Sequence, residues 1–333
     1  MRILLIGVGR WGKEHLRVLT ELGAEVWVAD LDPARLALAT KMFGVDPGRT
    51  TLDFRSALDA VDAVDVVTPA DSHLALVRQC LEARKDCFVE KPLTRTVAEA
   101  RVLAEVVRQT GRLLQVGHIF RFHPATDLLR RCLAEGSVGQ IRYVSGRFSG
   151  FKRPRTDAWV TQTDVIHYFD LFTYLLGHLP SAITAIMRDY LGRGLDDLAF
   201  ITVEYGEVLA FVEAGYFAAG TFRDCVVVGT KGSLTADFSQ SVVTAFRNIH
   251  QRRDGHWIAD AGEPEVFKAV GKEPLLQELA SFVESVRTSH APPVGVEDGL
   301  LALRVVDAAR CSSLLGRRVT LEEVTQGEGH APH

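Results

Sequence analysis

Lys91 is the residue whose type and position most directly suggest chemistry. It stands between Glu90 and Pro92, after the apolar stretch 87–89. A lysine at the carboxyl end of a parallel strand points into the crevice in which open α/β sheets bind ligands. Pro92 keeps Lys91 from starting a regular helix, because the residue before a proline is pushed out of the α region. The sequence therefore predicts an ammonium group presented to a ligand. The alternative is a solvated surface lysine.

A second group of reactive side chains lies in the segment 163–177. Its apolar residues recur at helical spacing, and Gly177 is suited to end a helix. On such a helix Asp164, His167 and Asp170 are three residues apart and share a face. A histidine flanked by carboxylates can act as a general base, because an unperturbed imidazole titrates at about 6.5. The alternative is a core histidine hydrogen-bonded to Asp170.

Three glycines near the start have the spacing of a dinucleotide-binding loop. The apolar run 2–6 leads into Gly7-Val8-Gly9-Arg10-Trp11-Gly12, and a helical pattern follows. Gly7 permits a tight turn, Gly9 lets a pyrophosphate approach the backbone, and Gly12 lets the helix pack on the strand. The N-terminus of that helix would face the phosphates. We expect Arg10 and Trp11, in the same loop, to contact the cofactor as well.

Asp30 follows the predicted strand 25–29 and lies 18 residues beyond Gly12. Near this spacing a carboxylate accepts hydrogen bonds from the adenosine ribose, and it would repel a 2′-phosphate. We therefore expect NAD as the cofactor and consider NADP the less suitable one. The alternative is that Asp30 merely opens a turn and caps the next helix, a role that Asp32 could fill alone.

Length and composition are typical of a two-domain enzyme. The chain has 333 residues, 47% hydrophobic and 24% charged, enough material for two cores. The net charge of −4 provides no basic field for nucleic acid. No apolar run could span a bilayer, and the opening stretch is too short for a secretory signal. The five cysteines are scattered, and neither they nor the histidines show metal-ligand spacing. We expect reduced thiols, a cytoplasmic protein and no catalytic metal.

The elements that position these residues change character along the chain. Up to residue 123 strands alternate with helices, which indicates an α/β fold with a doubly wound parallel sheet. From residue 124 short strands separated by glycines indicate an α+β domain with a mainly antiparallel sheet and its helices on one face. We predict a nucleotide-binding domain 1–123 and a domain 124–333 for substrate binding and oligomerisation. The expected strands are 2–6, 25–29, 63–67, 87–89, 112–116, 140–150, 182–190, 198–205, 208–217, 222–229 and 232–238, and the expected helices are 33–43, 71–83, 97–109, 125–135, 274–288 and 297–315.

Several ordered motifs resemble those of the glucose-fructose oxidoreductase/inositol dehydrogenase/rhizopine catabolism (Gfo/Idh/MocA) family, and the match spans nearly the whole chain. The resemblance implies an N-terminal Rossmann domain and a C-terminal open sheet often used for dimer or tetramer contacts. We therefore expect a homodimer or homotetramer. The motifs are Gly7 to Gly12, Thr68-Pro69-Ala70-Asp71-Ser72-His73, Glu90-Lys91-Pro92-Leu93, the stretch Val116 to Pro124, His167-Tyr168-Phe169-Asp170 and the turn Gly229 to Leu234.

The resemblance also implies roles for individual residues. Lys91 would lie near the nicotinamide and the substrate hydroxyl, and His167 would handle the proton. The peptide bond before Pro92 is frequently cis in this family. The other contacts implied are Glu90 at the nicotinamide ribose, Thr68, Pro69 and His73 along the cofactor trough, and Arg121 near the cofactor or substrate.

The chain departs from the family pattern just before His167. The family usually places an aspartate four residues before the histidine, with a glycine midway. Here those positions hold Thr163 and Val165. Asp164 is three residues before His167 and could reach the same face of a helix. Whether Asp164 or Thr163 takes the role of the family aspartate stays open.

The predicted reaction is reversible oxidation of a secondary alcohol on a sugar, inositol or nucleotide-sugar. His167 would remove the hydroxyl proton and Lys91 would stabilise the developing alkoxide, while the nicotinamide performs the redox step. Lys152, near Arg153 and Arg155, would meet an anionic substrate group, or else belong to a solvated loop. Trp159 would stack on a sugar face, or else pack in the core.

Two other functions are compatible with the fold. One is a non-catalytic dinucleotide-binding regulator, which is known within this family. A regulator could lose Lys91 or His167, and both are present. The other is a reductase of a C=N or conjugated double bond, which needs the hydride site but less of a histidine base.

Overall fold

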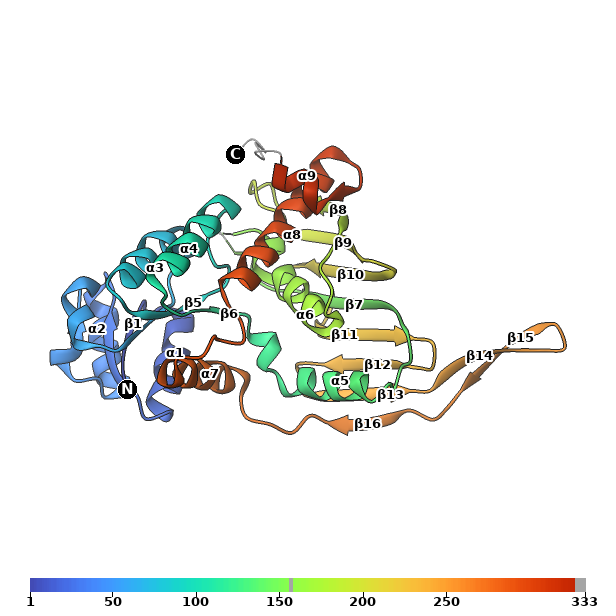
Figure 1. Ribbon diagram of the computed structural model, residues 1–333, viewed down its shortest axis with the longest axis horizontal. Coiled ribbons are helices and arrows are strands. Elements are labelled where there is room, and N and C mark those ends of the chain that lie inside the picture. The colour runs from blue at the N-terminus through green and yellow to red at the C-terminus, as the bar shows by residue number, and fades with distance from the viewer. Residues whose placement is uncertain (156–157, 327–333) are drawn as a thin grey trace. The chain divides into compact units, whose positions relative to one another are not determined.

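The computed structural model describes residues 1–155 and 158–326 (Figure 1). The chain forms two compact units. The first contains Met1–Ile119 and Glu273–Leu303, and the second contains Phe120–Lys272 and the chain from Arg304 onward.

The first unit is built on a parallel sheet of six strands in the order β3-β2-β1-β4-β5-β6. The central strands β1 and β4 are almost wholly buried, as expected for a parallel sheet covered on both faces. The strand order reverses between β1 and β4, and open α/β sheets bind ligands outside the carboxyl ends of the strands at such a point. The predicted doubly wound sheet is confirmed. Its strands are β1 Arg2–Ile6, β2 Glu25–Ala29, β3 Thr50–Thr51, β4 Ala63–Val66, β5 Asp86–Glu90 and β6 Leu114–Gly117.

Helices α2 and α4 begin and end close to the predicted residues, whereas the helix predicted for 71–83 begins only at His73, after a 3₁₀ turn. Asp32 accepts a hydrogen bond from the backbone of Ala34 at the start of α2, and Gly44 ends that helix with φ of 68°. Thr96 and Glu99 form a capping box at the start of α4. The helices are α1 Arg10–Glu21, α2 Pro33–Phe43, α3 His73–Glu82, α4 Val97–Thr110 and α7 Pro274–Thr288, with 3₁₀ turns at Pro47–Arg49, Phe54–Ala60 and Ala70–Ser72.

Helix α7 belongs to the first unit although it is distant in sequence. Its buried Leu279 and Phe282 join the same apolar core as Leu16 of α1 and Phe88 of β5. The compact units therefore differ from the ranges 1–123 and 124–333, because the apolar face of α7 completes the core around the first sheet.

The second unit contains a sheet of nine strands in the order β16-β13-β12-β11-β7-β10-β9-β8-β17. It is antiparallel apart from the parallel pair β7 and β10, so the predicted mainly antiparallel sheet is confirmed. The strands after residue 241 were not predicted. β15 and β16 are exposed along their whole length, whereas β13 is an apolar run with a buried Val243, which was a usable signal. A separate hairpin of β14 and β15 extends from this sheet (Figure 1). The strands are β7 Ile141–Gly150, β8 Ala182–Arg188, β9 Leu198–Tyr205, β10 Val208–Gly215, β11 Thr221–Gly229, β12 Ser233–Asp237, β13 Val242–Phe246, β14 Asn248–Arg253, β15 His256–Ala261, β16 Glu265–Lys268 and β17 Val319–Thr320.

Helices α5 and α6 pack on this sheet. The ring of Tyr168 on α6 lies so close to Gly146 of β7 that a Cβ there would come within 2.3 Å of it. The predicted regular helix across Asp164 and His167 needs correction, because a π-helical turn, Thr161–Val165, precedes α6. The carboxylate of Asp196 holds that turn by accepting hydrogen bonds from the backbone and hydroxyl of Thr161. The helices are α5 Pro124–Ala134, α6 Ile166–Leu176, α8 Val296–Leu315, which continues from the first unit, and α9 Leu321–Gln326, and a 3₁₀ turn covers Ile119–Phe122.

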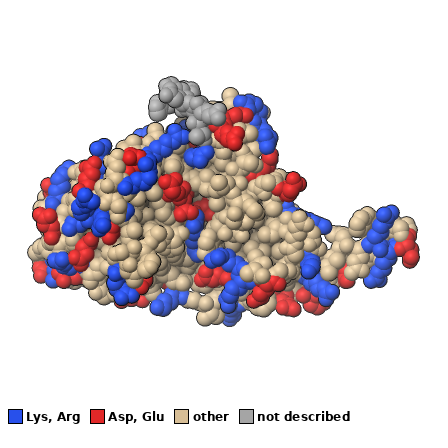
Figure 2. Space-filling model, viewed as in Figure 1, with Lys and Arg blue, Asp and Glu red and all other residues tan. Residues whose placement is uncertain are grey.

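Lys and Arg are interspersed with Asp and Glu on the face shown in Figure 2. In the part of the chain that the structure describes, no helix is both long enough and apolar enough to cross a bilayer. Within the same residues no cluster of three or more His, Cys, Asp or Glu side chains is arranged to hold a metal ion. The five cysteines are free thiols.

Candidate functional site

The glycine loop follows β1 and is shaped by two close backbone contacts. Gly7 has φ of +95°, and a Cβ there would come within 2.4 Å of the carbonyl oxygen of Val67. A Cβ on Gly12 would come within 2.0 Å of the carbonyl oxygen of Gly7. Gly9 differs, because nothing lies within 4 Å of its Cβ position. The fold itself requires Gly7 and Gly12, whereas Gly9 leaves the outer side of the loop clear, which fits a pyrophosphate against the backbone.

The substitution Gly9→Ala tests this difference. Gly9 has φ of −68°, which alanine also adopts, so we expect an unchanged thermal unfolding midpoint. The added methyl group would stand where the pyrophosphate approaches. We expect the dissociation constant for NAD to rise at least about tenfold, equivalent to about 1.4 kcal/mol. Calorimetric titration with NAD measures it. Gly7→Ala is the control and should lower the unfolding midpoint, and wild-type affinity in Gly9→Ala would contradict the assignment.

Asp30 connects the glycine loop to the turn after β2. Its two carboxylate oxygens accept hydrogen bonds from the backbone of Val8 at 2.8 Å and of Asp32 at 2.9 Å. The guanidinium of Arg35 lies 3.5 Å from the same carboxylate. The capping half of the alternative for Asp30 is wrong, because Asp32 caps α2, but its contact with the backbone of Asp32 does open the turn after β2 as that alternative expected. Asp30 is a buried acid beside the loop.

The loop containing Lys91 is fixed at the carboxyl end of β5. The Lys91–Pro92 peptide bond is cis, as the family resemblance implies. His73 bridges this loop to the end of β4, with Nδ1 2.9 Å from the carbonyl oxygen of Pro92 and Nε2 2.9 Å from that of Thr68. Burial lowers the pKa of His73, and these carbonyl contacts only partly oppose it. The structure thus brings together Thr68, His73 and Lys91, and Pro69 opens the turn between the first two.

A buried charged triad lies beneath this loop. His15 has Nδ1 2.8 Å from Asp65 and Nε2 3.2 Å from Glu90, and both ring nitrogens can donate only if the imidazole is cationic. Glu90 also accepts hydrogen bonds from the indole of Trp11 at 2.8 Å and from the backbone of Lys91 at 3.1 Å. The triad therefore links the first turn of α1 to the Lys91 loop.

The electrostatics of the triad follow from its burial and its two carboxylates. Burial lowers the pKa of His15, but Asp65 and Glu90 outweigh that effect and raise the pKa to about 10. Burial raises the pKa of Asp65. Burial also opposes ionisation of Glu90, yet its bonds to His15 lower its pKa overall. His15 and Asp65 were not predicted as site residues, although an aspartate inside the apolar strand 63–67 is a usable signal.

Stability should depend on pH through His15. Its pKa in the folded protein, about 10, lies above the unfolded value of 6.5. The stabilisation is therefore complete below pH 6.5, decreases between pH 6.5 and 10 by up to about 1.4 kcal/mol per pH unit, and is lost above that range. Urea unfolding across this window measures the slope. His15→Gln should flatten it, and an equal slope in both proteins would refute a cationic His15.

In the second unit, His167 is buried among aromatic rings. Its ring stacks on Phe120 at a centroid distance of 4.9 Å and on Phe148 at 5.8 Å. Asp170, one turn further along α6, accepts two hydrogen bonds from the guanidinium of Arg121, at 2.8 and 2.5 Å. Arg121 therefore holds α6 through Asp170, and its contact with a cofactor or substrate stays a prediction.

Asp164 lies in the π-helical turn and forms an ion pair with Lys152 at 2.5 Å. The ammonium group of Lys152 is 4.7 Å from the centroid of the Phe148 ring. Lys152 and His167 therefore both contact the ring of Phe148. Thr163 donates its hydroxyl to the carbonyl oxygen of Trp159 at 3.0 Å. Both side chains are therefore engaged, Asp164 with Lys152 and Thr163 with Trp159, and which of them takes the role of the family aspartate stays a prediction.

Trp159 packs against the guanidinium of Arg310, which lies 4.1 Å from its ring centroid. This contact agrees with the packing alternative for Trp159, and its stacking on a sugar stays a prediction.

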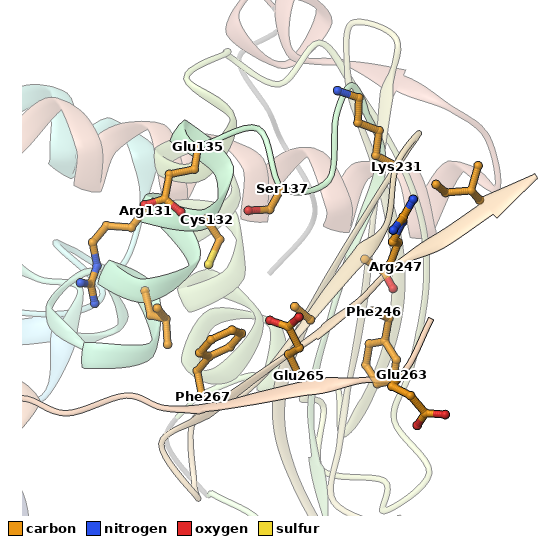
Figure 3. Close-up of a pocket in the computed structure, with 14 residues that line it drawn as sticks. Arg131, Cys132, Glu135, Ser137, Lys231, Phe246, Arg247, Glu263, Glu265 and Phe267 are labelled. Atoms are coloured by element: carbon orange, nitrogen blue, oxygen red, sulfur yellow. The ribbon is translucent and has the colours of Figure 1, made fainter. Parts of the chain in front are cut away.

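A separate pocket of about 680 Å³ lies beside α5, β13 and β16, and its lining mixes Arg131 and Lys231 with Glu135 (Figure 3). None of the predicted site residues lines this pocket, and its mixed charges indicate no ligand class.

Two family models match the chain. The description "oxidoreductase family, NAD-binding Rossmann fold" applies to residues 1–118, and "oxidoreductase family, C-terminal alpha/beta domain" applies to residues 130–321. The chain belongs to this Gfo/Idh/MocA oxidoreductase family. The resemblance drawn from the motifs is confirmed, and so is the prediction of an enzyme of the oxidoreductase class.

Similar proteins align with this family member over nearly its whole length. An inositol 2-dehydrogenase of Rhizobium meliloti is 25% identical, covering 96% of this chain and 99% of that protein. A UDP-N-acetylglucosamine 3-dehydrogenase of Acidithiobacillus ferrooxidans is 31% identical, with coverages of 93% and 95%. The crystal structure of an oxidoreductase from Agrobacterium radiobacter, in complex with NAD+, L-tartaric acid and magnesium, has a TM-score of 0.82 at 18% identity and coverages of 97% and 98%. That structure shares the fold.

Proposed function

We propose that this oxidoreductase transfers a hydride between NAD and a secondary alcohol of a sugar, inositol or nucleotide-sugar. The observation that carries the proposal is the Lys91 loop, held between His73 and the Glu90 triad at the carboxyl end of β5. Cofactors of open α/β enzymes bind at this edge of the sheet. Relatives named for inositol and UDP-N-acetylglucosamine support a hydroxyl group on a ring as the substrate.

The residues of the first unit fit a dinucleotide. The clear space outside Gly9 suits the pyrophosphate, and the N-terminus of α1 supplies N–H groups toward it. Thr68, Pro69 and His73 would line the trough, with Arg10 and Trp11 at the first turn of α1. The carboxylate of Asp30 would accept hydrogen bonds from the ribose and disfavour a 2′-phosphate, so NAD is preferred over NADP. When bound, the nicotinamide supplies the carbon that accepts the hydride.

The protein groups handle charge and the proton. His167 takes the hydroxyl proton as a general base, and Asp164 assists it from the preceding turn. Lys91 donates a charge-assisted hydrogen bond to the oxygen as it becomes an alkoxide. Glu90 is fixed by His15 and Trp11, so it holds the backbone of Lys91 in place.

The test is NAD reduction by the purified protein with a panel of inositols, hexoses and UDP-sugars. We expect turnover with at least one ring alcohol and a lower dissociation constant for NAD than for NADP. NAD binding without turnover on any alcohol would favour the regulator. Oxidation of NADH by imines or conjugated ketones alone would favour the reductase.

We also propose that the protein forms a homo-oligomer through the face of the second sheet that carries exposed apolar side chains. Ile186, Phe200 and Phe211 there are between 41% and 54% exposed. An apolar patch of this kind usually marks an interaction surface. Phe200→Asp should shift the protein to smaller species in analytical ultracentrifugation, whereas a monomeric wild type would refute the proposal.

A further inference from the structure

Arg223 is an inward-facing cation near His167 to which no role has been assigned so far. It lies on β11 directly opposite Phe148 of β7, and its guanidinium carbon is 3.4 Å from the centroid of that ring. Its hydrogen bonds, at 3.3 and 2.6 Å, both run from Nη1 to the carbonyl oxygens of Ser149 and Phe222. Across the described residues, Arg223 forms no ion pair with a carboxylate.

Counted over residues 1–155 and 158–326, the charges in contact with this ring do not balance. Lys152 and Arg223 bring two positive charges, and Asp164 brings one negative charge, which is already paired with Lys152. Burial lowers the pKa of Lys152, and repulsion from Arg223 adds to this, although Asp164 opposes both. Burial likewise lowers the pKa of Arg223. A half-buried cluster with one surplus positive charge is one that an anion would stabilise.

The cluster is also placed beside the proposed base. Arg223, Lys152 and His167 all lie against the same ring of Phe148, at centroid distances of 3.4, 4.7 and 5.8 Å. Nε and Nη2 of the Arg223 guanidinium have no hydrogen-bond partner within the described ranges and suit a bidentate contact. The ammonium group of Lys152 has three N–H donors, one of which is bonded to Asp164. An oxyanion held by Arg223 and Lys152 would therefore lie beside the aromatic ring on which His167 stacks.

We propose that Arg223 and Lys152 bind an oxyanion of the substrate, a carboxylate or a phosphate, so that the substrate is an acidic or phosphorylated sugar rather than a neutral polyol. This inference rests on the proposed function in one respect: it takes the bound anion to be part of the substrate that His167 deprotonates. The carboxylate and phosphate forms share the same recognition chemistry, and the experiment separates them.

The experiment compares glucuronate, glucose 6-phosphate and glucose as probes, by calorimetric binding to the NAD-loaded protein and by NAD reduction. We expect the wild type to bind at least one anionic probe tenfold or more tightly than glucose. Arg223→Gln should remove most of that preference. Arg223→Lys keeps the positive charge but cannot donate two parallel N–H bonds, so it should remove part of the preference. Tight binding of glucuronate alone identifies a carboxylate, and tight binding of glucose 6-phosphate alone identifies a phosphate.

Arg147→Gln is the matched control. Arg147 is the neighbouring arginine on β7, stacked 4.2 Å from the ring centroid of Phe222, but it is paired with Asp224. It should keep the wild-type preference. Equal binding of all three probes by the wild type, or an unchanged preference in both Arg223 variants, would overturn the proposal. Arg223-dependent anion binding without NAD reduction would support the anion site while counting against the proposed function.

Discussion

Replacing Lys91 with methionine is expected to lower kcat by about 10³-fold, with NAD affinity nearly unchanged. Removing one preorganised donor from a developing oxyanion typically costs about 10²- to 10³-fold, and the lost donor here is charged. Two of the contacts that fix this loop run from His73 to the carbonyl oxygen of Pro92 and from the Lys91 backbone to Glu90. They do not involve the ammonium group, so the loop should persist in the variant.

Steady-state kinetics with the substrate found in the panel, together with calorimetric titration of NAD, measure the two quantities. Lys41→Met is the matched control, because Lys41 is exposed in the last turn of α2 in the same unit. It should behave as wild type. A Lys91→Met protein with full turnover would remove Lys91 from the reaction.

Replacing His167 with glutamine is expected to lower kcat by about 10²- to 10⁴-fold, the usual contribution of a positioned general base. Glutamine is polar and similar in size, so the cavity between Phe120 and Phe148 stays filled. If His167 removes the proton, the kcat of the wild type should decline toward acid pH, and the variant should lose that decline. NAD binding should be retained.

The matched control for His167 is His178→Gln, because His178 is exposed just beyond the end of α6. It should leave both kcat and its pH profile unchanged. A residue with a merely structural role would change the unfolding midpoint without changing the shape of the pH profile. If both the Lys91 and the His167 variants turned over like wild type, the proposed catalytic assignment would be wrong.

The local features of the cofactor domain could be predicted from the sequence. The strand Arg2–Ile6, the glycine loop and helix α1 follow one another within about 20 residues, and each depends on near neighbours: apolar runs, a positive φ at Gly7 and helical spacing. The position of Lys91 at the end of β5 follows for the same reason. The family motifs extended the fold prediction to the whole chain, and the matches to the two family models confirm the family.

Other features could not be predicted locally, because they depend on which elements meet. The sequence indicates a helix at 274–288, but its apolar face could pack on either unit. Only its packing against Leu16 and Phe88 shows that it belongs to the first unit. The π-helical turn Thr161–Val165 depends on Asp196, which is more than 30 residues away and holds Thr161. Strands β15 and β16 lack an apolar pattern, so only pairing with their neighbours defines them.

By itself the sequence determined the fold class and the glycine loop, because these depend on residue type and short spacing, and it predicted Lys91 and His167 as the catalytic residues. The tertiary structure alone decided how the charges are paired. His15 meets Asp65 and Glu90 across 50 and 75 residues, Asp170 is taken by Arg121, and Arg223 stacks on Phe148 without a carboxylate among the described residues. An ion pair forms wherever packing and strand register bring opposite charges together, and spacing along the chain does not encode that.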